Sequence, residues 1–125
     1  MKVIAILVLM VCAAAIPGRT SPKFDEYYTI IGIKAENKRL DNYAIQINNW
    51  PKSRGLVLIY AQDERTVKRA QARARRAVKY LVQTRGVDPT RVKWRYEAAC
   101  GHEMIQLYIL ESTLADLEPD PKCIR

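Results

Sequence analysis

Residues 64–92 read ERTVKRAQARARRAVKYLVQTRGVDPTRV, and this stretch decides much of the fold. Its apolar residues recur at helical spacing, which predicts an amphipathic helix from about Glu64 to Arg85. Gly86 follows at the position where a left-handed residue commonly ends a helix. The segment Asp88-Pro89-Thr90 then predicts a turn, because proline fixes its φ angle and aspartate accepts hydrogen bonds from the backbone. The predicted buried face consists of Val67, Ala70, Ala74, Ala77, Val78 and Leu81.

Working outward, β-branched and aromatic runs predict four strands, and a second apolar stripe predicts one more helix. The helix runs from about Ala35 to Asn49 and ends before Pro51. The run GLVLIY at residues 55–60 is almost continuously apolar, which is typical of a strand inside a sheet. The other strands are expected at Tyr27–Ile33, Val92–Tyr96 and Met104–Leu110.

The predicted order is therefore β-α-β-α-β-β, an α/β two-layer sandwich with two helices packed on one face of a small mixed sheet. Helical crossovers after the first and second strands favour parallel neighbours, and the last two strands are expected to form an antiparallel hairpin. This domain is expected to span residues 27–111, followed by an irregular tail at 112–125.

The first 15 residues have the layout of a secretory signal peptide. Lys2 precedes an apolar run from Val3 to Val11, and small residues up to Ala15 suit a cleavage site. The apolar run is too short to span a bilayer, so we expect an exported protein without a transmembrane anchor after cleavage. Residues 16–26 are then a linker. An uncleaved anchor and lipidation at Cys12 are the alternatives, although Val11 stands where a lipidation motif needs a small residue.

Export also bears on the cysteines, because thiols in oxidising compartments tend to form disulfides. If Cys12 leaves with the signal peptide, Cys100 and Cys123 remain as a predicted pair, with two unpaired thiols as the alternative. Such a bridge would stabilise the folded state by about 3 kcal/mol in the chain-entropy model, because it restricts the unfolded chain. Cys100 and His102 alone make a poor zinc site, so no metal and no cofactor is predicted.

Positive charge is concentrated in the long helix. The chain has a net charge of +8, and residues 64–85 hold eight basic residues against one acidic residue, Glu64. Two interpretations stand: a solvated helix face, or a surface for a polyanion or a carboxylate ligand. Nucleic acid is not the expected partner, because the chain has an export signal, no groove-reading motif and no aromatic residues interleaved among the basic residues from Arg65 to Lys79.

Catalysis has little support in the sequence. The single histidine, His102, has no serine or cysteine arrangement around it that makes a triad, and Cys100 two residues away has poor geometry for a nucleophile–base pair. No glycine-rich phosphate loop is present. We therefore expect a binding protein and not an enzyme.

The stretch RARRAVKYLVQTRGVDPTRV, residues 73–92, resembles the signature of the OmpA-like domain, a peptidoglycan-associating module of bacterial envelope proteins. The matching residues are Arg73-Ala74, Val78, Tyr80-Leu81, Gly86-Val87 and Arg91-Val92. The resemblance covers about residues 28–110 and implies the same element order as the pattern of apolar residues. It also implies a location in the periplasm or at the outer membrane.

In that family an arginine and an aspartate bind the carboxylate and the amine of the diaminopimelate in peptidoglycan. The resemblance places the arginine at Arg73, and Asp63 stands loosely where the aspartate is expected, although the family's Gly-His-Thr-Asp loop is absent. Arg69 and Arg76 are further candidate ligand contacts. The alternative is a basic-helix scaffold that docks an acidic protein or an anionic envelope polymer without specificity for peptidoglycan.

Overall fold

A computed structural model describes residues 23–111, which fold in the predicted order β-α-β-α-β-β. The signal peptide, Cys12, Cys123 and the C-terminal tail of the sequence interpretation lie outside these residues. The helices and strands are β1 (Lys23–Tyr28), α2 (Ile33–Asn49), β2 (Ser53–Ala61), α3 (Val67–Lys79), β3 (Val92–Ala99) and β4 (Met104–Glu111).

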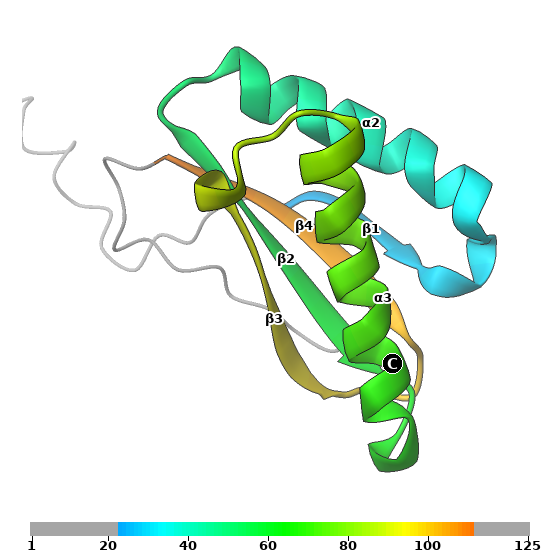
Figure 1. The fold of residues 1–125 in the computed structure, drawn as a ribbon. Coiled ribbons are helices and arrows are strands. Elements are labelled where there is room, and N and C mark those ends of the chain that lie inside the picture. The colour runs from blue at the N-terminus through cyan, green and yellow to red at the C-terminus, as the bar shows by residue number, and fades with distance from the viewer. Residues whose placement is uncertain (1–22, 112–125) are drawn as a thin grey trace, which may run out of the picture.

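The four strands form one mixed sheet in the order β1-β4-β2-β3 (Figure 1). β2 and β3 are parallel, as expected for strands joined by a helix, whereas β4 runs antiparallel to both of its neighbours. The predicted hairpin of the last two strands is wrong, because β4 inserts between β1 and β2. That insertion also separates β1 from β2, so the expected parallel pair at the first crossover is absent.

Burial explains why the last strand is central. Side chains on both faces of β4 are buried, whereas the edge strand β3 carries the exposed residues Lys93 and Arg95. A strand buried on both faces gains most from neighbours on both sides, and charged side chains are common on edges. Both properties are visible in the sequence, but the sequence interpretation used continuous burial only for β2 and did not use the charges of β3.

Both helices cover the same face of the sheet, as predicted for a two-layer arrangement (Figure 1). Ala70, Ala74 and Ala77 on α3 are fully buried against it, so the helix lies close to the strands. Alternate residues of β2 and β4 point to the opposite face, since successive strand residues alternate. There, together with Cys100 just after β3, they form a second buried cluster: Leu58, Tyr60, Cys100, Met104, Tyr108 and Leu110.

The first strand differs from its prediction. β1 begins at Lys23, inside the expected linker, and ends at Tyr28, so the predicted strand from Tyr27 to Ile33 is mostly wrong. Residues Thr29–Ile31 form a short 3-10 turn, and Gly32 has a φ of 92°, a conformation that favours glycine. This turn reverses the chain into α2, which places β-branched residues in a turn where sequence propensity favoured a strand.

The long helix has three parts in place of one. A 3-10 turn at Glu64–Thr66 precedes α3, and a π-helical turn follows at Tyr80–Thr84. In this wider turn the amide of Arg85 donates to the carbonyl of Tyr80 at 3.2 Å. Gly86 then has a φ of 72°, which confirms the predicted left-handed helix end.

Arg91 joins three elements through its guanidinium group. Its Nη2 donates to the carbonyl oxygens of Ile47 (2.6 Å) and Trp50 (2.7 Å) at the end of α2, and its Nε donates to the carbonyl of Ser53 (2.9 Å). Carbonyls at a helix C-terminus have no intrahelical partners, and a cation there also interacts favourably with the helix dipole. Arg91 therefore anchors the end of α2 to the start of β2.

We expect Arg91→Ala to lower the free energy of unfolding by about 2–3 kcal/mol. The reason is that partly buried backbone carbonyls lose the charged donor of their hydrogen bonds. Arg91→Lys should restore only part of the lost stability, since lysine lacks the planar guanidinium group whose several N–H donors reach different carbonyls. Urea denaturation measures both, with the exposed Lys93→Ala as the control. Equal stability of Arg91→Ala and the control would contradict this role.

Candidate functional site

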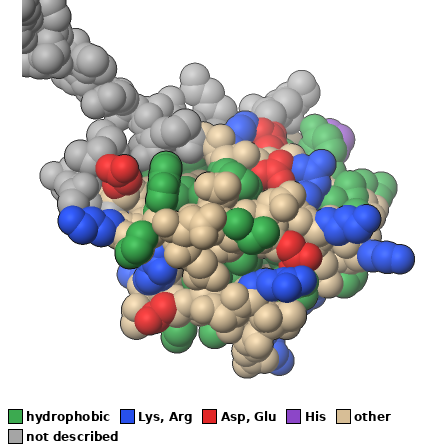
Figure 2. All heavy atoms as spheres, turned by 90° about the horizontal axis from the view of Figure 1, so that it is seen from above, with side chains coloured by type: hydrophobic (Ala, Val, Ile, Leu, Met, Phe, Trp, Pro, Cys, Tyr) green, Lys and Arg blue, Asp and Glu red, His purple; other side chains and the backbone are tan. Residues whose placement is uncertain are grey.

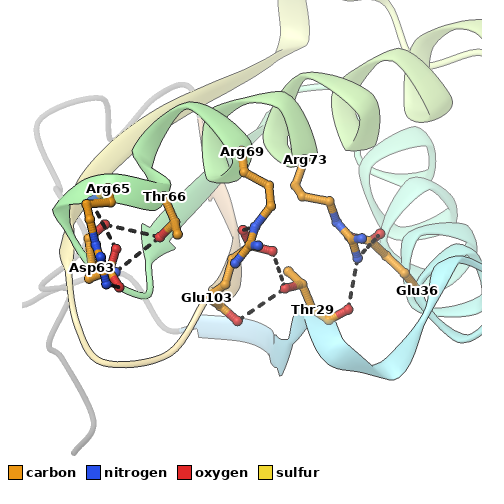
Figure 3. Close-up of polar contacts among 8 residues, drawn as sticks. All are labelled: Thr29, Glu36, Asp63, Arg65, Thr66, Arg69, Arg73 and Glu103. Carbon is orange, nitrogen blue, oxygen red and sulfur yellow. Dashed lines mark hydrogen bonds and ion pairs between the residues drawn. The ribbon is translucent and has the colours of Figure 1, made fainter.

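The basic residues of α3 and its flanking turns divide among different faces of the helix. Arg69, Arg73 and Arg76 follow the spacing i, i+4, i+7, so they lie on one side. Figure 3 shows Arg69 and Arg73 extending from α3 toward Glu103, Thr29 and Glu36. A second set projects to solvent from another side, and we call it the outer stripe: Arg65, Lys68, Arg75 and Lys79.

A fully buried carboxylate, Glu36 of α2, organises the first side. Its Oε1 lies 3.3 Å from Nη2 of Arg73 and 3.5 Å from Nη2 of Arg76. Its Oε2 accepts a hydrogen bond from the hydroxyl of Tyr27 at 2.5 Å. Burial, and then the neighbouring Glu36 carboxylate, raise the pKa of Tyr27 well above its usual value, so this hydroxyl stays protonated as a donor.

Arg73 is held in place but is not fully engaged. Besides Glu36, its Nη2 donates to the backbone carbonyl of Thr29 at 2.9 Å. Its Nε is buried without a hydrogen-bond partner, and within residues 23–111 its Nη1 makes no hydrogen bond or ion pair. The guanidinium group therefore has a fixed orientation and donor capacity to spare.

Arg73 lines a hollow of about 590 Å³, which we call the charged hollow. Its walls include Tyr28, Ile30, Arg69, Arg73, His102 and Glu103. Nε of Arg69 lies 3.4 Å from Oε2 of Glu103, and the other Glu103 oxygen accepts from the Thr29 hydroxyl. The side chain of Arg69 is 61% exposed and that of Glu103 is 12% exposed. Two guanidinium groups and one carboxylate thus face one cavity.

Asp63 is not part of this cavity. It caps the start of the helix, where its carboxylate accepts from the backbone amide of Arg65 at 2.9 Å and lies 3.8 Å from the Arg65 side chain. It lines a neighbouring hollow of about 410 Å³ that shares Gln62, Gly101 and His102 with the charged hollow. In Figure 3, Arg69 lies between Asp63 and Arg73. The acidic group paired with Arg73 is Glu36, and the acidic residue that lines the same hollow as Arg73 is Glu103.

Arg76 also lies away from the cavity. Its Nη2 donates to Oδ1 of Asn37 at 2.6 Å, and its guanidinium carbon lies 5.9 Å from the centre of the Tyr80 ring. Arg76 therefore packs α3 against α2. Of the four candidate ligand residues, Arg69 and Arg73 share a cavity, while Asp63 and Arg76 make contacts elsewhere.

Acidic residues from other elements neutralise much of the helix charge. Glu103 pairs with Arg69, Glu36 with Arg73 and Arg76, and Asp41 with Arg85 at 2.6 Å. Hydrogen bonds from Tyr80 and Arg85 lower the pKa of Asp41, which keeps it ionised. On the face drawn in Figure 2, basic and acidic side chains are interspersed. The helix itself has few acidic residues, and acidic residues from other elements of the fold provide the counter-charges for its arginines.

Three members of the outer stripe remain without an acidic partner in the described part of the chain: Lys68, Arg75 and Lys79. The guanidinium of Arg75 lies over the Trp94 ring of β3 at 5.7 Å, a cation–π contact that keeps its charge at the surface.

Cys100 is disulfide-bonded and therefore presents no thiolate to His102. Its partner lies outside the described residues, so the pairing with Cys123 stays a prediction. His102 lies against the ring of Tyr28, with 5.0 Å between the ring centres. Across residues 23–111, no three His, Cys, Asp or Glu side chains form a group that could hold a metal ion. No helix in the same range is long and apolar enough to cross a bilayer.

Glu36 and Glu103 were not among the residues picked from the sequence. Glu36 had a signal, because it precedes Leu40 by four residues and therefore extends the apolar stripe of α2. A carboxylate on a buried stripe needs a cation. Glu103 had no such signal in the sequence, since its contact with Arg69 depends on how the turn before β4 packs against α3.

A scan against protein-family models matches no family, and a search of the curated proteins finds no match for the chain.

Replacing Glu36 tests the buried network. Glu36→Gln keeps the shape but leaves two partly buried arginines without a counter-charge, so we expect a loss of about 3–5 kcal/mol in the free energy of unfolding. The exposed Glu111→Gln is the control. Urea denaturation of both variants measures the difference, and a loss below about 1 kcal/mol for Glu36→Gln would show that the network contributes little.

Proposed function

We propose that this chain is an exported envelope domain of the OmpA-like kind that binds the peptide part of peptidoglycan non-covalently. One observation carries the proposal: Arg69, Arg73 and Glu103 line a single hollow. The free end of diaminopimelate is a zwitterion, with a carboxylate and an ammonium group on one carbon. Such a ligand needs cationic donors and an anionic acceptor within a few ångströms, and the charged hollow offers both.

The geometry suggests how each group would be used. The ligand carboxylate would accept hydrogen bonds from the unengaged Nη1 of Arg73 and from Arg69. The ammonium group would donate to Glu103, whose carboxylate is mostly buried and oriented by Thr29. Before binding, Arg69 and Glu103 face each other at 3.4 Å. Arg69 is the exposed member of this pair, with 61% of its side chain exposed against 12% for Glu103. Its guanidinium group can therefore turn to a ligand carboxylate while the ligand ammonium group replaces it as the cation beside Glu103.

In this proposal Glu103 takes the part that the resemblance assigned loosely to Asp63. The change follows from the position of Asp63, which caps the helix and does not line the charged hollow. The signal-peptide layout of residues 1–15 supports placement in the periplasm or at the outer membrane, where the cell wall is accessible. The order of the strands and helices is compatible with the OmpA-like resemblance and supports it at the level of architecture.

Ligand titration tests this proposal. We expect meso-diaminopimelate to bind the mature protein in calorimetry, and Glu103→Gln and Arg69→Ala each to weaken binding about 10- to 100-fold, because each removes a charged hydrogen-bond partner. Lys68→Ala on the outer stripe is the matched control and should bind as the wild type does. Arg73 is unsuitable as the first variant, since it also pairs with buried Glu36. Absence of binding, or equal losses in all three variants, would contradict the proposal.

The outer stripe favours a second candidate function. Lys68, Arg75 and Lys79 project from one side of α3 to solvent, and their charges are not neutralised by residues 23–111. A stripe of this kind suits an acidic protein surface or an anionic envelope polymer. Binding there would be electrostatic and would not depend on the charged hollow.

Salt dependence separates the two candidates. Binding to the stripe should weaken steeply between about 50 and 300 mM salt, because exposed charges are screened over about 10 Å at 0.1 M. We expect the triple variant Lys68→Gln/Arg75→Gln/Lys79→Gln to lose most binding to polyglutamate while keeping its affinity for diaminopimelate. If diaminopimelate competes with polyglutamate, the stripe is not an independent surface.

A further inference from the structure

An exposed apolar segment borders the charged hollow. Ile30 is 88% exposed, and Tyr28, Ile31 and Ile33 are also exposed. The segment is exposed because the turn at Thr29–Ile31 and the positive φ of Gly32 reverse the chain above the core. Single exposed apolar residues are ordinary, but several neighbouring ones beside a cavity are typical of a binding surface.

Tyr28 and Ile30 are the members of this segment that line the charged hollow, and we call them the apolar shelf. Thr29 lies between them and is fixed twice, by Arg73 at its carbonyl and by Glu103 at its hydroxyl. The residues that carry the charges therefore also position the shelf. His102, which also lines the charged hollow, packs against the Tyr28 ring.

The hollow is larger than one amino acid requires. Its volume of about 590 Å³ falls within the roughly 300–1,000 Å³ of sites that hold drug-sized ligands. Its charged groups lie at Arg69, Arg73 and Glu103, so the polar groups of a zwitterion would bind there and the apolar shelf would offer them no partner. Such sites commonly combine a few placed polar groups with apolar walls that bind the rest of the ligand.

We propose that the ligand is a peptide in which the zwitterionic residue is followed by a residue with an apolar side chain, and that this side chain packs on Tyr28 and Ile30. The inference rests on the proposed function, because the charged hollow must first hold the zwitterion. The shelf then determines which neighbouring residue is preferred. Ile31 plays no part, since it lines a different hollow beside Arg39.

A series of four probes tests the inference: free meso-diaminopimelate and three dipeptides that join one of its ends to glycine, alanine or leucine and leave the other end free. Wild-type affinity should rise from the glycine to the alanine to the leucine dipeptide. We expect about two- to fourfold tightening for each methyl-sized group that becomes buried. Ile30→Ser should flatten this series, so that the ratio between the affinities for the leucine and glycine dipeptides falls toward one.

Ile45→Ser is the matched control, because Ile45 is an exposed isoleucine on α2 that does not line the hollow. It should keep the wild-type series. If diaminopimelate binds but the three dipeptides bind equally well, the apolar shelf does not select the ligand and the inference fails alone. If Ile30→Ser and Ile45→Ser keep the same series, the preference arises elsewhere and the inference also fails. If no probe binds, the proposed function fails and the inference with it.

Discussion

The buried carboxylate of Glu36 is the interaction on which the rest of the structure depends. It belongs to α2, accepts from Tyr27 at the end of β1, and pairs with Arg73 and Arg76 of α3. A charge without access to water is tolerated only when cations and hydrogen bonds surround it. Together with its partners, Glu36 links three elements, β1, α2 and α3, so satisfying this one group fixes how both helices lie on the sheet.

The same network prepares the candidate site. Arg73 uses its Nη2 to contact both Glu36 and the carbonyl of Thr29, so its Nη1 stays available to a ligand in the proposed site. Thr29 in turn orients Glu103, so the anionic and cationic parts of the charged hollow are positioned through a shared neighbour. A preorganised site of this kind loses little conformational freedom on binding, which favours affinity for a small ligand. The outer stripe has no such support and suits diffuse electrostatic contacts.

Local patterns predicted the elements well, and tertiary contacts set the rest. The spacing of apolar residues located both helices. Gly86 marked the end of the helical stretch that continues past α3, and Asp88-Pro89-Thr90 marked the turn before β3. The Tyr27–Ile33 strand failed because β-branched propensity at Ile30 and Ile31 was overruled by the turn at Gly32. The hairpin failed because chain order does not decide which strand is central. Arg69 and Arg73 could be chosen from the sequence, whereas Glu103 could not, since it is brought to them only by the packing of α3 over the turn before β4.

The most direct test of the central claim is nuclear magnetic resonance of the arginine side chains during titration with meso-diaminopimelate. Binding in the charged hollow predicts saturable shifts of the Nε–Hε signals of Arg69 and Arg73, while that of Arg75 on the outer stripe stays in place. The same titration of Glu103→Gln should show much weaker shifts. Signals of Arg69 and Arg73 that do not move, or shifts of Arg75 that match theirs, would contradict the account.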